Sequence, residues 1–436
     1  MALKSRRHPA QGVIRMKPEM SDRPGTPGAN TAPVQLRRNI TLPLLVLYGL
    51  GVTIGAGIYV LVGATAERAG TFAPSSFLIA ALVMLFSAGS FGELSGRHPQ
   101  SAGEAVYVEA GFRSPTLTVI TGGLLLFAAI ISSAAITVGS AGYIATLVDL
   151  PGWIIIVAIA GFTCVLASWG IVESVAFAAV LTLIEILGLV AVVVAGVWGN
   201  PEIMSRLPEV IVSPADASAL AAVSAGSLLA FFAFIGFDGM VNIVEETRTP
   251  ARNMPLGILL TLVIATILYF SVSSVAVLTL PLEDLSESSA PLSLLFQRLT
   301  GVSPLFITLI AIGATLNGVV IQAILASRVL YGLANVGRLP AVLARVNPRT
   351  RTPILATVLV SGCTLVFAVF LPIGVLAERT TQVVLVVFLL INASLIAIKW
   401  RGDPAPEGIF VVPFFVPLVG FLTCLLMLVV PLLLQL

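Results

Sequence analysis

Long apolar stretches with few or no charged residues recur along nearly the whole chain. Eleven of them are long enough for a bilayer-spanning helix, which needs about 20 apolar residues. Continuous apolar runs predict helices, since the strands of a transmembrane barrel would be short and alternating. The expected helices occupy residues 39–66, 69–92, 114–148, 150–172, 174–201, 217–237, 253–282, 299–327, 352–377, 380–398 and 408–436.

The composition supports a membrane environment. The chain has 436 residues, of which 58% are hydrophobic and 10% charged, and its mean hydropathy is +1.06. Soluble domains carry about 25% charged residues. A chain of this length cannot bury so much apolar surface in a water-soluble core. We therefore predict an all-α integral membrane protein with about eleven transmembrane helices, or twelve as the alternative, in contact with membrane lipid.

Basic residues favour one orientation of these helices. If eleven spans alternate across the membrane, 19 of the 23 Lys and Arg residues fall on the side of the N-terminus. The positive-inside rule then places the N-terminus in the cytoplasm of a cell-membrane protein. Residues 1–38 contain five prolines and a basic excess. They are predicted to form a disordered cytoplasmic tail before a transmembrane domain at residues 39–436.

Motifs for catalysis and for nucleotide binding are missing from the sequence. The three cysteines, Cys164, Cys363 and Cys424, fall inside predicted helices without metal-ligand spacing. No cluster of His, Cys and acidic residues suits a metal, and no Gly-Lys-Ser/Thr loop suits a phosphate. We expect no catalytic residues, no metal, no resident cofactor and no nucleic acid partner. A channel is disfavoured, because no ring of charges or filter-like run is present.

Glycines interrupt the first predicted span. Four glycines fall between Gly49 and Gly57, and each costs a helix interior about 1 kcal/mol relative to alanine. Gly55 and Gly57 would allow the helix to unwind and its backbone to approach a ligand. The alternative is close helix packing, because Gly51 and Gly55 have the spacing of small contact residues.

The sixth predicted span is interrupted as well, by Gly236, Asp238 and Gly239. Paired interruptions five helices apart indicate an inverted-repeat carrier whose substrate lies between the two broken helices. Five is an odd number, so the second unit inserts upside down relative to the first. The expected repeats cover residues from about 40 to 198 and from about 217 to 400, and a final helix covers about 409–435.

The motifs in these spans resemble those of the amino acid–polyamine–organocation transporters, especially the bacterial branch related to cationic amino acid transporters. The resemblance covers nearly all of residues 40–430. It is carried, in order, by Ile54-Gly-Ala-Gly-Ile58, Phe91-Gly-Glu-Leu-Ser95, Ser101-Ala-Gly-Glu-Ala-Val-Tyr107, Phe232-Ala-Phe-Ile-Gly-Phe-Asp238, Glu245-Glu-Thr-Arg-Thr-Pro250, Asn317-Gly318, Ser327-Arg328 and Leu339-Pro340. It implies a leucine-transporter-like 5+5 inverted repeat. The implied function is a secondary active permease that moves amino acids or related amines by alternating access.

The substrate site follows from the two interruptions, and the resemblance points to the same positions. Backbone amides at the positive end of a half-helix can hold a carboxylate, and free carbonyls can accept from an ammonium. Phe232 would also cover the substrate, or else only pack in the core. The expected binding residues are Ile54, Gly55, Ala56, Gly57 and Ile58 in the first span and Phe232, Ala233 and Ile235 in the sixth.

Three acidic residues near the sixth span are candidates for coupling or gating. Asp238 would either cap the second half of that helix or take part in coupling. Glu245 and Glu246 lie at a helix end whose dipole disfavours acids. We expect them to pair with Arg248, Arg252 or Arg328, either as an inner gate or as a salt network.

Glu185 is the one ionisable residue deep in the fifth span. The resemblance implies a lysine here in many proton-coupled relatives, so the sign of the charge is reversed in this chain. A carboxylate far from water is costly as an anion. It would carry a proton, hold a cation, or stay protonated as a structural group. We predict proton coupling through Glu185, with sodium coupling, amino acid or polyamine exchange and a non-transporting sensor as alternatives. The oligomeric state stays open.

Overall fold

A computed structural model describes residues 38–100, 103–169, 175–335 and 337–434. The predicted tail therefore lies outside the described residues, apart from Arg38. Within the described part the secondary structure is helical, with a single isolated bridge between Ile40 and Thr247. This agrees with the predicted all-α class.

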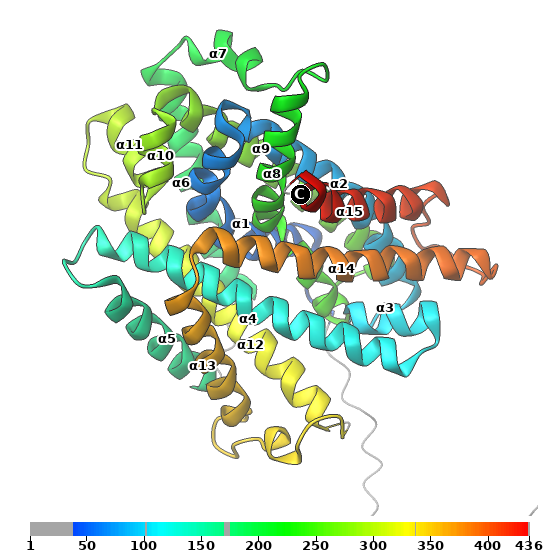
Figure 1. The fold of residues 1–436 in the computed structure, drawn as a ribbon. Helices are drawn as coiled ribbons and strands as arrows, with labels where there is room; N and C mark the ends of the chain where they lie inside the picture. Colours follow the sequence, from blue (N-terminus) through cyan, green and yellow to red (C-terminus); the bar gives the residue numbers. More distant parts are fainter. Residues whose placement is uncertain (1–37, 101–102, 170–174, 336, 435–436) are drawn as a thin grey trace, which may run out of the picture. The chain divides into compact units, whose positions relative to one another are not determined.

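Each expected span coincides over most of its length with one long helix, and Figure 1 shows these helices. The helices are α1 (Leu42–Ala69), α2 (Ala73–Arg97), α4 (Pro115–Ala145), α5 (Gly152–Trp169), α6 (Val175–Gly199), α8 (Ala217–Phe234), α9 (Pro250–Thr279), α12 (Leu305–Asn335), α13 (Ile354–Phe370), α14 (Ile373–Trp400) and α15 (Phe415–Leu434). Among the described residues, eight helical segments are long and apolar enough to cross a membrane, and three shorter apolar helices accompany them. The exact number of spans and the inverted repeat stay predictions.

Capping residues explain where several helices begin. Ser114 precedes Pro115 at the start of α4 and accepts a hydrogen bond from the Leu117 N–H. Asp216 accepts one from the Ala219 N–H at the start of α8. Such caps satisfy backbone donors that have no partner within the helix.

Short helices in the connections had not been predicted from the sequence. They are α3 (Gly103–Phe112), α7 (Ile203–Arg206), α10 (Leu282–Glu287) and α11 (Pro291–Thr300). Helix α14 also begins before its expected start, so that Glu378 and Arg379 fall in its first turns. A search for uncharged stretches cannot detect such segments, because they are short or carry charges.

The long helices pack against one another within the unit formed by residues 37–436. Helix α1 packs against α8 and α9, and α2 packs against the same two helices. Helix α12 packs against α4, while α13 packs against α5 and α4. Helix α14 lies along α4 and also contacts α15 (Figure 1).

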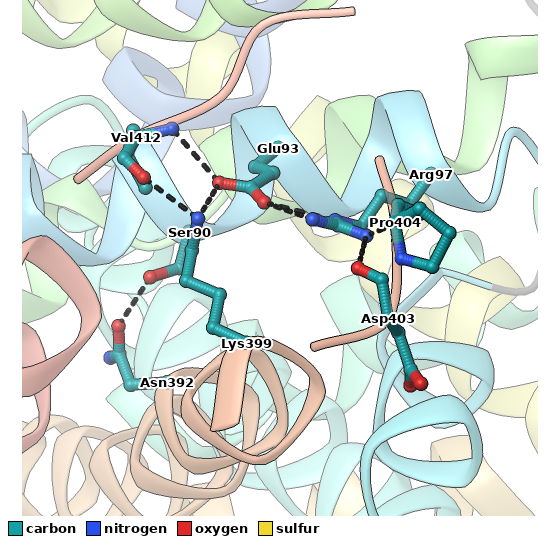
Figure 2. A network of polar contacts seen from close by, with 8 residues as sticks. All are labelled: Ser90, Glu93, Arg97, Asn392, Lys399, Asp403, Pro404 and Val412. Atoms are coloured by element: carbon teal, nitrogen blue, oxygen red, sulfur yellow. Dashed lines mark hydrogen bonds and ion pairs between the residues drawn. The ribbon is translucent and has the colours of Figure 1, made fainter. Parts of the chain in front are cut away.

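A buried ionic network joins α2 to α14 and to the segment before α15 (Figure 2). The Glu93 side chain is fully buried, and those of Arg97 and Lys399 are only 7% and 12% exposed. Arg97 contacts Glu93 Oε1 at 2.8 Å, and Lys399 Nζ lies 2.7 Å from Oε2. The Val412 N–H donates to the same Oε2 at 2.9 Å. Both carboxylate oxygens are therefore fully engaged.

Replacing Glu93 with alanine is expected to lower the free energy of unfolding by about 3–5 kcal/mol, since two buried cations would lose their partner. Denaturant titration of the purified protein in mixed micelles measures this change. Glu209→Ala is the matched control, because Glu209 forms a 2.9 Å pair with Arg206 at the surface, where ion pairs contribute little. Equal losses in the two variants would contradict the structural role of Glu93.

Candidate functional site

The sixth span is interrupted in the structure, which confirms the prediction for this helix. Helix α8 ends at Phe234, Ile235 is extended, and Gly236 has φ +131° before the 3-10 helix η3 (Phe237–Glu246). Only glycine adopts this φ readily. A Cβ atom on Gly236 would also lie 2.7 Å from the Val52 carbonyl oxygen of α1. The interruption therefore needs glycine for its conformation and for its contact with α1.

The predicted interruption of the first span is wrong for this structure. Helix α1 is a continuous α-helix through Gly55 and Gly57. A Cβ atom on Gly57 would lie 2.2 Å from Ala233 Cα, and one on Gly55 would lie 3.3 Å from the Ala314 carbonyl oxygen. The glycines therefore allow α8 and α12 to approach α1, as the helix-packing alternative proposes.

Aromatic side chains hold both sides of the break in α8. The Phe388 ring of α14 packs edge-on against Phe231 before the break and against Phe237 after it, with ring centroids 5.8 Å and 5.7 Å away. Tyr269 of α9 places its hydroxyl 2.9 Å from the carbonyl oxygens of both Thr53 and Ala233. These contacts tie the break to α1, α9 and α14.

A small cavity of about 20 Å³ lies beside the break. This volume holds about one water molecule, so an amino acid can enter only if the surrounding helices or side chains move. The lining residues come from α1, α4, the end of α8 and α12: Val52, Thr53, Gly57, Ser132, Ile136, Phe232, Ile235, Gly318, Ile321 and Gln322.

Three of the predicted binding residues, Gly57, Phe232 and Ile235, line this cavity. The others lie elsewhere. Ile54, Ile58 and Ala233 are fully buried in helix packing, Gly55 faces α12, and the Ala56 side chain lies outside the description. The Ala233 carbonyl, one of the expected acceptors, lies 2.9 Å from the Tyr269 hydroxyl and shares its single proton with the Thr53 carbonyl. A carbonyl oxygen has two lone pairs, so one acceptor position is left.

The cavity walls on α4 and α12 had not been predicted. Gln322 Nε2 donates to Ser132 Oγ at 3.4 Å, and both residues line the cavity. The Thr53 hydroxyl is buried and has no hydrogen-bond partner among the described residues. The available signal was weak: Gln322 and Ser132 are single polar residues inside otherwise apolar spans.

Glu185 lies on α6, and its side chain is buried, with 3% of the residue exposed. Its backbone carbonyl accepts the Tyr59 hydroxyl of α1 at 2.7 Å. The Tyr59 carbonyl in turn accepts the Tyr143 hydroxyl of α4 at 2.5 Å. Glu185 also lies within electrostatic range of the Tyr59 and Tyr269 hydroxyls. It is therefore linked to the helices that form the cavity, although it does not line it.

Asp238 stabilises the break directly. Its Oδ1 accepts the Gly236 N–H at 2.8 Å. Asp238 is the second residue of η3, whose N-cap is Gly236 without a side-chain hydrogen bond, so the expected N-capping by Asp238 is not found. The expected pairing of Glu246 is not found, since no ion pair within 4 Å joins it to an arginine in the part of the chain that the structure describes. Instead its backbone carbonyl accepts the Ile40 N–H at 3.0 Å. Glu245 lies beside it in the last turn of η3.

Glu104 lies in the first turn of α3, next to this region. The preceding Gly103 packs on Val241 and Asn242 of η3, where an added Cβ atom would lie 2.7 Å and 3.2 Å away. Burial, followed by the negative charge of nearby Asp238, raises the pKa of the Glu104 carboxyl to about 8. The folded protein therefore keeps a proton on Glu104 that the unfolded chain loses near its ordinary pKa of 4.5.

We expect the melting temperature in detergent to fall as the pH rises between about 5 and 8, because over this range the unfolded state binds fewer protons than the folded state. Glu104→Gln cannot ionise, so its pH dependence should be weaker. Thermal unfolding at several pH values measures both curves. Glu109→Gln, on the exposed side of the same helix, serves as the control and should follow the parent. Parallel curves for the parent and Glu104→Gln would refute the assignment.

Comparison with known proteins defines the class. The sequence profile of the family described as "Amino acid permease" matches residues 41–435. The chain therefore belongs to this family of the amino acid–polyamine–organocation group, and it is a multi-pass membrane transporter rather than an enzyme. This confirms the resemblance noted in the sequence.

Individual relatives extend the match over most of the chain. "Branched-chain amino acid permease BcaP" of Bacillus subtilis (strain 168) is 28% identical over 87% of this chain and 85% of its own length. "Cationic amino acid transporter 2, vacuolar" of Arabidopsis thaliana is 30% identical over 86% of this chain, which spans only 62% of that relative. "Methylthioribose transporter" of Bacillus subtilis (strain 168) is 27% identical over 92% of this chain and 90% of its own length.

Proposed function

We propose that this permease is a secondary active transporter that moves amino acids across the cell membrane by alternating access, coupled to protons. The observation that carries the proposal is the cavity at the break of α8, enclosed by α1, α4 and α12, in a member of the amino acid permease family. The relatives' names include branched-chain amino acids, cationic amino acids and methylthioribose. They support a small organic solute, most often an amino acid, and leave its side chain open.

The substrate ammonium is proposed to bind at the C-terminal end of α8. The negative end of the helix dipole favours a cation there, and the Ala233 carbonyl keeps one acceptor position beside the Tyr269 hydroxyl. The buried Thr53 hydroxyl, which has no partner among the described residues, offers another contact.

The substrate carboxylate is proposed to bind backbone amides that become available when α1 unwinds at Gly55 and Gly57. In the present conformation these amides belong to a continuous helix. Glycine lowers the cost of unwinding, because it favours the helix by about 1 kcal/mol less than alanine does. Alternating access would then include a change in α1 at the level of the α8 break.

The inverted repeat and a cytoplasmic N-terminus belong to the same proposal. The packing of α1 against α8, five predicted spans later, supports the repeat.

The chain before α1 is joined to the end of η3 by two backbone hydrogen bonds. The Ile40 N–H donates to the Glu246 carbonyl, and the Arg248 N–H donates to the Ile40 carbonyl. These two segments are proposed to move together as an inner gate, which includes Glu245.

Uptake of labelled amino acids into proteoliposomes tests the function. Accumulation that depends on an inward proton gradient supports a proton-coupled carrier. Counterflow without net accumulation would instead indicate an exchanger. Saturable binding without any flux would overturn transport in favour of a sensor. Protein-free liposomes are the control for leakage.

A further inference from the structure

The cavity wall is uncharged. None of the described side chains that line it belongs to Asp, Glu, Lys, Arg or His. The acidic residues Asp238 and Glu185 do not line the cavity. Asp238 accepts the Gly236 N–H, and Glu185 lies on α6, which contributes no lining residue. When the surrounding helices or side chains move to admit a substrate, a charged side chain among these lining residues would therefore meet no opposite charge.

The wall contains both polar and apolar side chains. Thr53, Ser132 and Gln322 contribute a hydroxyl, a second hydroxyl and an amide. The apolar part is formed by Ile136 of α4, Ile321 of α12, and Phe232 with Ile235 at the break. The aliphatic groups of Ile136, Ile321 and Ile235 come from three different elements, so more than one helix contributes apolar contacts to the cavity.

From this wall we infer that the transporter selects amino acids with uncharged, aliphatic side chains and excludes cationic and acidic ones. Gln322 determines the preference for neutral over cationic substrates. The inference rests on the proposed transport function. Burying a guanidinium or ammonium group without an opposite charge is strongly unfavourable, whereas burying an aliphatic group against isoleucine is favourable.

Gln322 is the position where one change of charge should alter this preference. Its Nε2 donates to Ser132 Oγ at 3.4 Å. In Gln322→Glu the side chain keeps its shape and becomes a carboxylate. The Ser132 hydroxyl can reverse its role and donate to this carboxylate, since a hydroxyl both donates and accepts. The second carboxylate oxygen then faces the cavity and can pair with a substrate cation.

Thermal stabilisation by free amino acids, measured in detergent, tests the inference, because a ligand that binds the folded state raises its melting temperature. For the parent we expect leucine, isoleucine and valine to bind about 100-fold or more tightly than arginine or lysine. Gln322→Glu should bind lysine and arginine about 10-fold or more tightly than the parent does. Gln297→Glu, the same change at an exposed position of α11, should leave all affinities unchanged.

The outcomes distinguish the proposed transport of amino acids from the proposed selectivity for uncharged side chains. A parent that binds none of the amino acids would overturn the proposed function itself. A parent that binds arginine as tightly as leucine would overturn the selectivity while leaving amino acid transport in place. This second result needs no variant, so it stands even if Gln322→Glu does not fold. A folded Gln322→Glu with unchanged lysine affinity would overturn the role of Gln322.

Discussion

Gly57→Val is expected to abolish amino acid binding. A Cβ atom at this position would lie 2.2 Å from Ala233 Cα and 2.9 Å from the Ala233 carbonyl oxygen. These are backbone atoms, which cannot rotate away, so α1 and α8 must move apart. The movement would separate the Thr53 and Ala233 carbonyls that Tyr269 holds together, and it would deform the cavity that Gly57 lines. We expect the affinity to fall by about 100-fold or more and the free energy of unfolding by about 1–3 kcal/mol.

Binding of labelled leucine to the purified variant, together with its melting temperature, measures these effects. Gly57→Ala gives a graded version of the same clash if the valine variant does not fold. Gly123→Val is the matched control, because a Cβ atom on Gly123 of α4 meets nothing within 4 Å. A folded Gly57→Val variant with the affinity of the parent would show that the substrate does not bind at the contact between α1 and α8.

Glu185→Gln is expected to remove accumulation driven by an inward proton gradient while sparing exchange at equal pH. Glutamine imitates the protonated side chain but cannot release a proton. Glu185 is buried on α6, and its backbone carbonyl holds the Tyr59 hydroxyl of α1. A change in its charge would therefore be felt at α1, where the proposed unwinding takes place. We expect the variant to show no accumulation above the equilibrium level, a loss of up to about 10-fold for one coupled proton and a gradient of one pH unit.

The same measurements separate the three roles considered for this residue. A proton carrier loses gradient-driven accumulation and keeps exchange. A site that holds a cation loses both, since glutamine carries no charge. A permanently protonated structural group keeps both. Glu202→Gln, at an exposed position after α6, controls for the loss of an acidic residue. If Glu185→Gln accumulates substrate as well as the parent does, proton coupling through Glu185 is wrong.

The sequence by itself determined where the long helices lie. Residues 114–148 predicted α4, which the structure places at Pro115–Ala145. In lipid every backbone polar group needs a hydrogen bond, and a helix supplies these bonds within its own segment, so a long apolar stretch can be recognised as a helix without knowing its neighbours. The break at Gly236 was equally local, because two glycines and an aspartate within four residues disfavour a regular helix.

Whether the glycines of α1 unwind the helix or allow close packing depends on tertiary contacts. Gly55 and Gly57 are compatible with unwinding and with close packing, and the backbones of Ala314 and Ala233 settle this conformation in favour of packing. The cavity walls depend on tertiary contacts as well. Ser132 and Gln322 are separated by 190 residues, and each is an ordinary polar residue within its own span. Their meeting depends on how α4 packs against α12, and the pattern within either helix does not encode that contact.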